Sequence, residues 1–398
     1  MIQIMCYYMK IKKIKVWNFK SFKYMDLDLA NFNVIIGPNS SGKSNLISIF
    51  QFLKDISKQG IENAISLQGG NNFIFNLNSS RKESLKIEVV FGDISFRTMT
   101  LLDKHRKQQL SEIIYTIELS LFNKSNRLKE FTETMEYRSD SRSIYTLKNN
   151  NGNLELSGSL KKSFRDFFPK QSDKIPNGTV LNFLEGLPFF VYFSKLIHIY
   201  DIDPKLSKRS IPISGLAELE SDAGNMAIIL KKIITNKKLN DKLLNFLSTC
   251  LPFISRIDVE NQQDKSIIFK LKEKYSPNSP IPATLISDGT IEIIAIIYAL
   301  YLEDGDIVVI EEPEKNIHPQ ILSILVEFMK DVSTKKQIVI TTHSPETIQN
   351  VELNNIILVN RDNNGNSITE KPSKNKQIAQ FLTDNIGLSD LFVDGFLS

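Results

Sequence analysis

The chain has 398 residues, 41% of them hydrophobic, which is enough for about two domains of ordinary size with a real core. Its 49 Lys and Arg against 45 Asp and Glu leave a net charge of +4, a balance that permits a nucleic-acid partner without arguing for one. The two cysteines, Cys6 and Cys250, lie far apart and have no second pair of ligands near them, so the sequence supports neither a disulfide framework nor a zinc site.

The longest apolar stretches, Ile291–Leu302 and Leu187–Tyr200, are well short of the roughly 20 residues that a membrane helix requires. The opening segment has no basic leader and no small-residue cleavage site, so it does not predict a signal peptide. We therefore expect a cytoplasmic protein with no membrane partner. Because the segment from Met9 looks like a natural start, we expect residues 1–8 to be a poorly ordered extension, and either Met1 or Met9 can be the first residue.

The first elements form a strand, a glycine-rich loop and a helix. Two short strands are predicted at Ile14–Phe19 and Phe32–Ile36, with polar turns between them. The second strand runs directly into Gly37. Apolar residues from Leu46 to Leu53 then recur at helical spacing, so we expect a helix immediately after the loop.

The loop matches the pattern G-x-x-x-x-G-K-[ST], which binds phosphate groups. We expect nucleotide binding by Gly37, Pro38, Asn39, Ser40, Ser41, Gly42, Lys43, Ser44 and the adjoining Asn45. The glycines let backbone N–H groups face one anion, and the start of the helix adds a favourable dipole. Lys43 would reach the β and γ phosphates, and Ser44 would contribute a ligand to Mg²⁺. The alternative is a glycine-rich turn with a chance lysine.

The middle of the chain alternates between apolar and polar residues and then becomes helical. An antiparallel β lobe is predicted, because short alternating segments are separated by polar turns. The polar stretch Asn149–Lys174 is expected to be disordered or mobile. The predicted elements are strands at Leu85–Phe91, Ile113–Phe122, Phe131–Tyr137 and Ile144–Leu147, helical structure within Leu216–Leu247, and strands at Ile254–Val259 and Ile267–Leu271.

Two buried parallel strands, Ile307–Ile310 and Gln337–Ile340, are predicted near the C-terminus, with a helix over Pro319–Met329 between them. The first strand ends in a pair of carboxylates. We assign Glu311 to the shell of a Mg²⁺ ion and Glu312 to orienting the attacking water, as a catalytic residue. An ordinary acidic pair at a surface strand end is the alternative.

The second strand is followed by His343, a candidate to hydrogen-bond a γ phosphate. With Lys43 and Glu312, it completes the candidate catalytic set. A packed or surface histidine is the alternative for any single histidine.

The segment Ser287-Asp288-Gly289-Thr290, followed by the apolar stretch Ile291–Leu302, resembles the variant signature motif of RecF-type ABC ATPases and of compact AAA-like ATPases of the AAA_21 type. Physically, Ser287 or Asp288 can cap the helix while Gly289 permits close approach; an ordinary helix cap is the alternative. Further segments that resemble RecF and SMC heads and these compact ATPases are Val16–Phe22, Ser221–Asn225, Glu312–Pro319, Thr342–His343 and Leu358–Asp362.

The resemblance implies an α/β fold, a P-loop NTPase of the ABC or RecF-head type, with an antiparallel β lobe and an inserted helical subdomain. It also implies that ATP and Mg²⁺ are bound, and that Ser287, Asp288 and Gly289 contact the γ phosphate held by a second copy, so that the chain forms a homodimer. Two departures from the family pattern are Glu311 in place of the usual Asp and a Q-loop glutamine for which Gln68 is only the best candidate.

We divide the chain into residues 1–82, the first half of the ATPase core; 83–282, the β lobe and helical insertion; and 283–398, the second half of the core. The resemblance implies an ATP-hydrolysing head that acts in DNA maintenance and repair or in anti-phage defence. The alternatives are an ATP-dependent scaffold with negligible hydrolysis that serves a separate nuclease or effector, and a transporter subunit, which the short signature disfavours.

A nuclease of the OLD type is also disfavoured, because the segment after His343 is too short for a Toprim domain and Asp201-Ile202-Asp203 fits a turn better than a metal site. Any nuclease would then be a separate partner. Basic clusters can contact DNA phosphates, although solvated faces are the favoured explanation. These clusters are Lys161-Lys162 with Arg165, Lys205 with Lys208-Arg209, and Lys231-Lys232.

Overall fold

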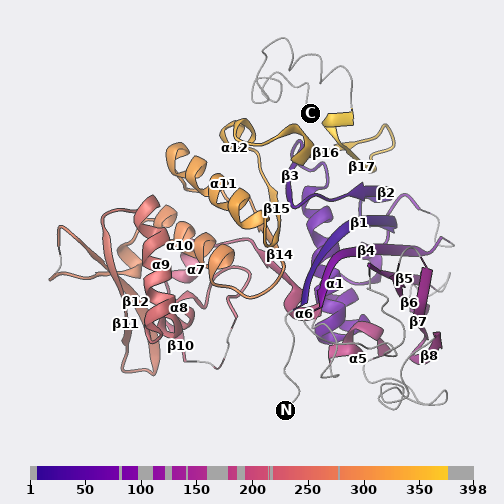
Figure 1. The fold of residues 1–398 in the computed structure, drawn as a ribbon, viewed down its shortest axis with the longest axis horizontal. Helices are drawn as coiled ribbons and strands as arrows, with labels where there is room; N and C mark the ends of the chain where they lie inside the picture. The colour runs from indigo at the N-terminus through magenta and orange to yellow at the C-terminus, as the bar shows by residue number, and fades with distance from the viewer. Residues whose placement is uncertain are drawn as a thin grey trace, which may run out of the picture.

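The structure is a computed structural model with three β-sheets and helices packed between and around them (Figure 1). It describes residues 7–79, 83–96, 111–121, 128–139, 142–158, 178–185, 193–213, 215, 218–276 and 278–374. In these residues the predicted α/β class, the antiparallel lobe and the helical insertion are all confirmed.

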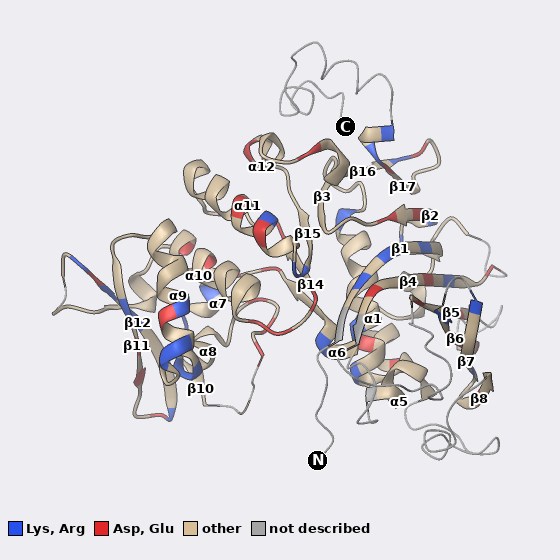
Figure 2. Ribbon diagram, viewed as in Figure 1, with Lys and Arg blue, Asp and Glu red and all other residues tan. Residues whose placement is uncertain are grey.

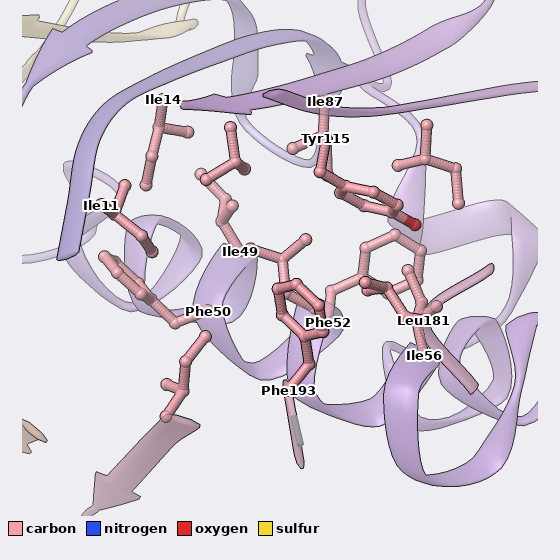
Figure 3. Packing of buried hydrophobic residues seen from close by; sticks show 14 of the residues in the cluster. Ile11, Ile14, Ile49, Phe50, Phe52, Ile56, Ile87, Tyr115, Leu181 and Phe193 are labelled. Carbon is pink, nitrogen blue, oxygen red and sulfur yellow. The ribbon is translucent and has the colours of Figure 1, made fainter. Parts of the chain in front are cut away.

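The first sheet has seven strands, all antiparallel, in the order β2-β1-β4-β5-β6-β7-β8. Its strands are β1 (Tyr7–Phe19), β2 (Phe22–Asp28), β4 (Leu85–Phe96), β5 (Glu112–Leu121), β6 (Leu128–Ser139), β7 (Arg142–Asn150) and β8 (Asn153–Gly158). Buried residues alternate along β5 and β6, as expected of a sheet with one face on a core. That face covers α1 (Lys43–Gln59) and α5 (Val180–Glu185), where Phe50 and Phe52 meet Ile14, Ile87 and Tyr115 (Figure 3).

The central sheet has six strands in the order β17-β16-β3-β15-β14-β9. Five are parallel and the edge strand β17 is antiparallel. Their bounds are β3 (Phe32–Ile36), β9 (Ile197–Tyr200), β14 (Ile307–Glu311), β15 (Gln337–Thr341), β16 (Ile356–Arg361) and β17 (Ser367–Glu370). Successive residues point to two different cores: Val309 packs with the α1 side, and Val308 and Ile310 pack with the opposite side. Burial on both faces explains why these strands are continuous apolar runs in the sequence.

The opposite side is a helical lobe around α10 (Asp288–Tyr301), in which every residue from Thr290 to Leu300 is buried. Its other elements are α7 (Pro204–Ser207), α8 (Met226–Ile234), α9 (Lys237–Cys250), α11 (Pro319–Ser333) and a small sheet of β10 (Ile211–Pro212), β11 (Ile254–Asn261), β12 (Ser266–Glu273) and β13 (Ile281–Pro282). The remaining short elements are α2 (Ile61–Leu67), α3 (Asn71–Ile74), α6 (Phe193–Leu196), α12 (Pro345–Gln349) and the 3₁₀ turns Ala283–Leu285, Leu353–Asn355 and Pro372–Lys374.

Two sequence predictions about the β lobe need correction. The segment between the first two predicted strands is not only turns, because β2 pairs with β1 across the tight connection between Phe19 and Phe22. The start of the stretch predicted to be disordered is a hairpin: β7 and β8 pair around Asn151 and Gly152, whose positive φ values of 50° and 90° suit a two-residue turn. Residues 159–174 of that stretch lie outside the described residues.

The N-terminal prediction is wrong for Tyr7 and Tyr8, which belong to β1; residues 1–6 lie outside the described residues. The first sheet contains strands from both sides of the division proposed at residue 83, and that division stays a proposal.

Candidate nucleotide-binding and hydrolysis site

The predicted phosphate loop connects the carboxyl end of β3 to the start of α1. Two of its glycines are required by their surroundings. A Cβ added to Gly37 would lie 2.1 Å from the carbonyl oxygen of Val359, and one added to Gly42 would lie 2.1 Å from the Ser367 hydroxyl; both glycines have positive φ. Lys43 Nζ donates hydrogen bonds to the carbonyl oxygens of Gly37, at 2.8 Å, and Pro38, at 2.9 Å. The loop therefore curls around the ammonium group, and loops of this kind bind phosphate through their backbone N–H groups.

Residues from two other segments hold this loop from outside. Arg361 Nε donates to the carbonyl oxygen of Ser40 at 2.9 Å. The Ser367 hydroxyl donates to the carbonyl oxygen of Ser41 and lies 2.7 Å from the Ser21 hydroxyl, and Asn45 Nδ2 donates to the same Ser21 oxygen at 2.8 Å. The β1–β2 turn and the β16–β17 hairpin thus support the shape of the phosphate loop.

The tip of β14 brings Glu311 to the start of α1, where the Ser44 hydroxyl donates to its carboxylate. Burial, followed by the nearby Asp201 carboxylate, raises the pKa of Glu311 to about 7. A hydroxyl and a carboxylate are the oxygen ligands that Mg²⁺ prefers, and a bound cation would favour the charged form of Glu311. Ser44 and Glu311 therefore fit the predicted metal role.

Glu312 and His343 face each other at the tips of β14 and β15, with His343 Nε2 3.7 Å from Glu312 Oε1. Burial, followed by the charge of Lys43, lowers the pKa of His343. Its ring is therefore neutral at neutral pH and can donate one hydrogen bond and accept another. The structure brings the three predicted catalytic residues Lys43, Glu312 and His343 together at one edge of the central sheet.

Glu314 holds the strand tips together. Its Oε1 accepts hydrogen bonds from the Thr342 hydroxyl at 2.8 Å and from the backbone N–H of His343 at 2.7 Å. The turn that carries the histidine is thereby tied to the loop that carries Glu312.

The signature residues Ser287, Asp288 and Gly289 are at the N-terminus of α10, in the lobe across the central sheet from α1 (Figure 1). The exposed Ser287 caps this helix, because its Oγ accepts from the N–H of Thr290 at 3.2 Å. Asp288 pairs with Lys208. In the described parts of the chain, the hydrogen bonds and ion pairs of these three residues do not reach the phosphate loop.

Sequence reasoning missed several residues of the site. Lys315 Nζ lies 3.0 Å from Asp201 Oδ1 and 3.4 Å from Glu312 Oε2, so Asp201 belongs to the surroundings of the site. Its sequence signal was that it follows β9, a short apolar run parallel to β14. Arg361 was noted only as part of a motif. Acidic residues gather in the connecting segments in the middle of the molecule (Figure 2).

The Q-loop role of Gln68 stays a prediction. Gln68 caps the end of α2, bonds to Asp55 and lines a cavity of about 590 Å³. The cavity opens beside Asn45, and Phe73, whose side chain is largely exposed, and Arg361 also line it. His318 caps α11, where its Nδ1 accepts from the N–H of Gln320 at 3.3 Å.

Comparison with known families identifies the fold and the class of protein. The AAA_21 family, described as "AAA domain, putative AbiEii toxin, Type IV TA system", matches residues 32–349. The chain belongs to this family. The match spans the phosphate loop, the signature segment and both strands that end in Glu311 and Thr341. The chain therefore has the arrangement of motifs of an AAA-type P-loop ATPase.

Curated relatives have low sequence identity to this chain, but the similarity covers most of its length. The chain is 23% identical over 350 residues to an "ATP/GTP phosphatase" of Helicobacter pylori, covering 85% of this chain and 86% of that protein. It is 23% identical to "Endonuclease GajA" of Bacillus cereus, covering 88% of this chain and 58% of that protein, and 24% identical to "Old nuclease" of Escherichia phage P2, covering 89% and 60%. The chain thus spans about three fifths of the length of the two nucleases.

Solved structures confirm the SMC-head-like ABC fold. A SmcHead bound to the C-winged helix domain of ScpA matches with a TM-score of 0.54 at 14% identity, covering 90% of this chain and 96% of that one. An Smc head domain bound to the C-terminal domain of ScpA, from Pyrococcus furiosus, gives 0.54 at 13% identity, covering 94% and 100%. None of the helices in the described part of the chain has the length and apolar composition needed to cross a membrane.

Proposed function

We propose that the protein binds ATP with Mg²⁺, hydrolyses it and forms a homodimer around the bound nucleotide. The observation that carries the proposal is the convergence of Lys43, Glu312 and His343: the charge of Lys43 acts on the His343 ring, and that ring lies 3.7 Å from the Glu312 carboxylate. Phosphoryl transfer needs a cation on the phosphates and an oriented water in one place.

Each residue has a defined part in this proposal. The N–H groups of Gly37–Ser44 and the Lys43 ammonium would bind the phosphates, while Ser44 and Glu311 would hold Mg²⁺, which offsets the charge that develops on the transferred group. Glu312 would orient the attacking water, and the neutral His343 would donate to the γ phosphate. The nucleoside would occupy the cavity beside Asn45, where the Phe73 ring offers a face to the base.

The position of the signature segment supports a two-headed enzyme. Ser287 is exposed at a helix N-terminus, which favours an anion, yet its contacts lie on the opposite side of the sheet from α1. A second copy would bring this helix end to the γ phosphate, and each nucleotide would then contact both chains.

The resemblance to RecF and SMC heads favours a role in DNA maintenance and repair or in anti-phage defence, and the two relatives named as nucleases favour DNA and a separate nuclease or effector as partners. A basic segment, Lys205–Arg209, comes shortly after Asp201 in the chain and could contact DNA phosphates, although its Lys208 pairs with Asp288. The alternative, an ATP-dependent scaffold that hydrolyses negligibly, is disfavoured by the presence of Glu312 next to the phosphate loop.

Assembly tests the proposal directly. Glu312→Gln should retain ATP but lose turnover, because the amide fills the space without polarising water, and with ATP and Mg²⁺ this variant should shift to dimer in light scattering coupled to size exclusion. Adding Ser287→Arg should abolish the shift while nucleotide binding persists. Ser248→Arg, at an exposed position of α9, is the matched control and should leave dimerisation intact. The same mass with and without ATP, or wild-type turnover in Ser287→Arg, would refute the two-headed mechanism.

A further inference from the structure

The loop Glu312–His318, which follows β14, is held in an unusual backbone conformation. Glu312 and Asn316 have φ values of 45° and 57°. Residues other than glycine adopt such angles rarely, and they keep them only where the surroundings hold the backbone in place. On one side, the support is Lys315, whose ammonium group binds both Asp201 and the carboxylate of Glu312.

On its other side the loop meets the first turns of the signature helix α10. Asn316 Nδ2 donates to Glu292 Oε2 at 3.1 Å, and a Cβ added to Gly289 would lie only 2.3 Å from the carbonyl oxygen of Asn316. The loop backbone and the helix are therefore as close as a glycine allows. Ile317, the next residue, packs against the core of the helical lobe.

The buried carboxyl of Glu292 does not improve the packing of the helical lobe. Glu292 is 2% exposed, in a helix whose other buried residues are mostly apolar. Among the described residues, Asn316 is the one that donates a hydrogen bond to its carboxyl group. A buried carboxyl with one hydrogen bond is costly, and an aliphatic residue would fill the same space more favourably. Burial raises the pKa of Glu292 to about 7, but a carboxyl oxygen accepts from the Asn316 amide in either protonation state.

We infer that Glu292 and Asn316 are positioning residues, whose contact fixes the Glu312 loop against the signature helix of the same chain and thereby orients the Glu312 carboxylate. The inference rests on the proposed hydrolysis of ATP. It follows that a second nucleotide touching the N-terminus of α10 would act on Glu312 of that chain through Gly289 and Asn316, whereas the Lys43 loop would be unaffected.

Steady-state ATP hydrolysis and binding of a non-hydrolysable ATP analogue test the inference. Glu292→Ala and Asn316→Gly should each lower kcat about tenfold, while KM and analogue affinity change by less than about twofold. Glycine suits the positive φ of Asn316, so that variant removes the amide without straining the backbone. Glu292→Gln should keep most of the turnover, because its amide oxygen accepts the same hydrogen bond. The double variant should be no slower than either single variant, because both remove one contact.

The matched control is Glu327→Ala, which removes a carboxylate paired with Lys330 at 2.7 Å on α11 and should leave kcat unchanged. Equal losses in Glu292→Gln and Glu292→Ala, or additive losses in the double variant, would overturn the inference. If Glu292→Ala does not fold, Asn316→Gly decides, and full turnover there overturns the inference. Wild-type protein without turnover would overturn it together with the proposed function, whereas turnover that is lost in Lys43→Ala but normal in Asn316→Gly overturns the inference alone.

Discussion

Replacing Gly289 by alanine is expected to lower the kcat of ATP hydrolysis strongly while the protein remains folded. The new Cβ would lie 2.3 Å from the carbonyl oxygen of Asn316, and real Cβ contacts are essentially never shorter than 3.0 Å. The loop or the helix must therefore move apart by at least 3.0 − 2.3 = 0.7 Å. The nearest atom belongs to the backbone, so no side-chain rotation can relieve the clash.

Two opposing terms set the effect of this substitution on stability. Overpacking of this kind costs about 1–3 kcal/mol. Alanine in place of glycine within a helix recovers up to about 1 kcal/mol. The net loss of unfolding free energy should therefore be no more than about 3 kcal/mol, small enough for the protein to remain folded. A displacement approaching 1 Å in the loop that carries Glu312 should nevertheless lower kcat on the order of tenfold.

Thermal unfolding, kcat and the affinity for a non-hydrolysable ATP analogue should be measured together. Gly215→Ala is the control, because a Cβ there meets nothing within 4 Å. If Gly289→Ala has wild-type kcat, the close approach of α10 to the loop is not needed for hydrolysis. If its affinity for the analogue falls in parallel with kcat, the displacement has reached the phosphate loop. The phosphate loop and the Glu312 loop are then not held independently, and the prediction is wrong.

Lys43→Ala should abolish ATP binding, measured with a fluorescent ATP analogue, because it removes the cation that the phosphate loop surrounds; unchanged turnover would refute the assignment. A pH effect is expected in the β lobe, where burial raises the pKa of Glu133 to about 7 although Tyr115, Asn149 and the N–H of Val180 donate to it. Since the folded pKa exceeds the unfolded value, the folded state binds the extra proton, so the free energy of unfolding should fall by up to about 3 kcal/mol as pH rises from about 4.5 to about 7. Denaturant titrations at pH 5 and 8 should show this slope in wild type and a smaller one in Glu133→Gln.

The local parts of the site were predictable because their signals lie within a few residues. The loop from Gly37 to Ser44 is constrained by glycines and flanked by a buried strand and an amphipathic helix, and each of these has its own pattern. The strands that end at Glu311 and Thr341 are apolar throughout because both faces of the central sheet are covered. Their parallel order then brings Glu312 and His343 to one edge.

Other parts could not be read from the sequence. The strand β2 was missed because its Asp and Lys residues resemble turn residues, and only pairing with β1 shows its alternation. The hairpin around Asn151 and Gly152 was missed because the residues on either side of its turn are polar. The contacts of Lys315 with Asp201 and of Asn316 with Glu292 join residues far apart in the chain, and no short motif encodes them.

The central sheet separates two hydrophobic cores. Because of this separation, a substitution in one core can change ATP affinity or kcat without changing the other. The phosphate loop leads into α1 and the core beneath the antiparallel sheet, whereas the signature helix α10 belongs to the other core. Glu312 lies at the boundary, because its own strand is shared while its loop contacts α10 through Asn316. A shift of the helical lobe relative to α1 would therefore move the Glu312 carboxylate and leave the phosphate loop unchanged. Substitutions at the contact between α10 and the loop should then lower kcat at constant affinity for ATP, and substitutions around Gly37 and Lys43 should lower the affinity itself.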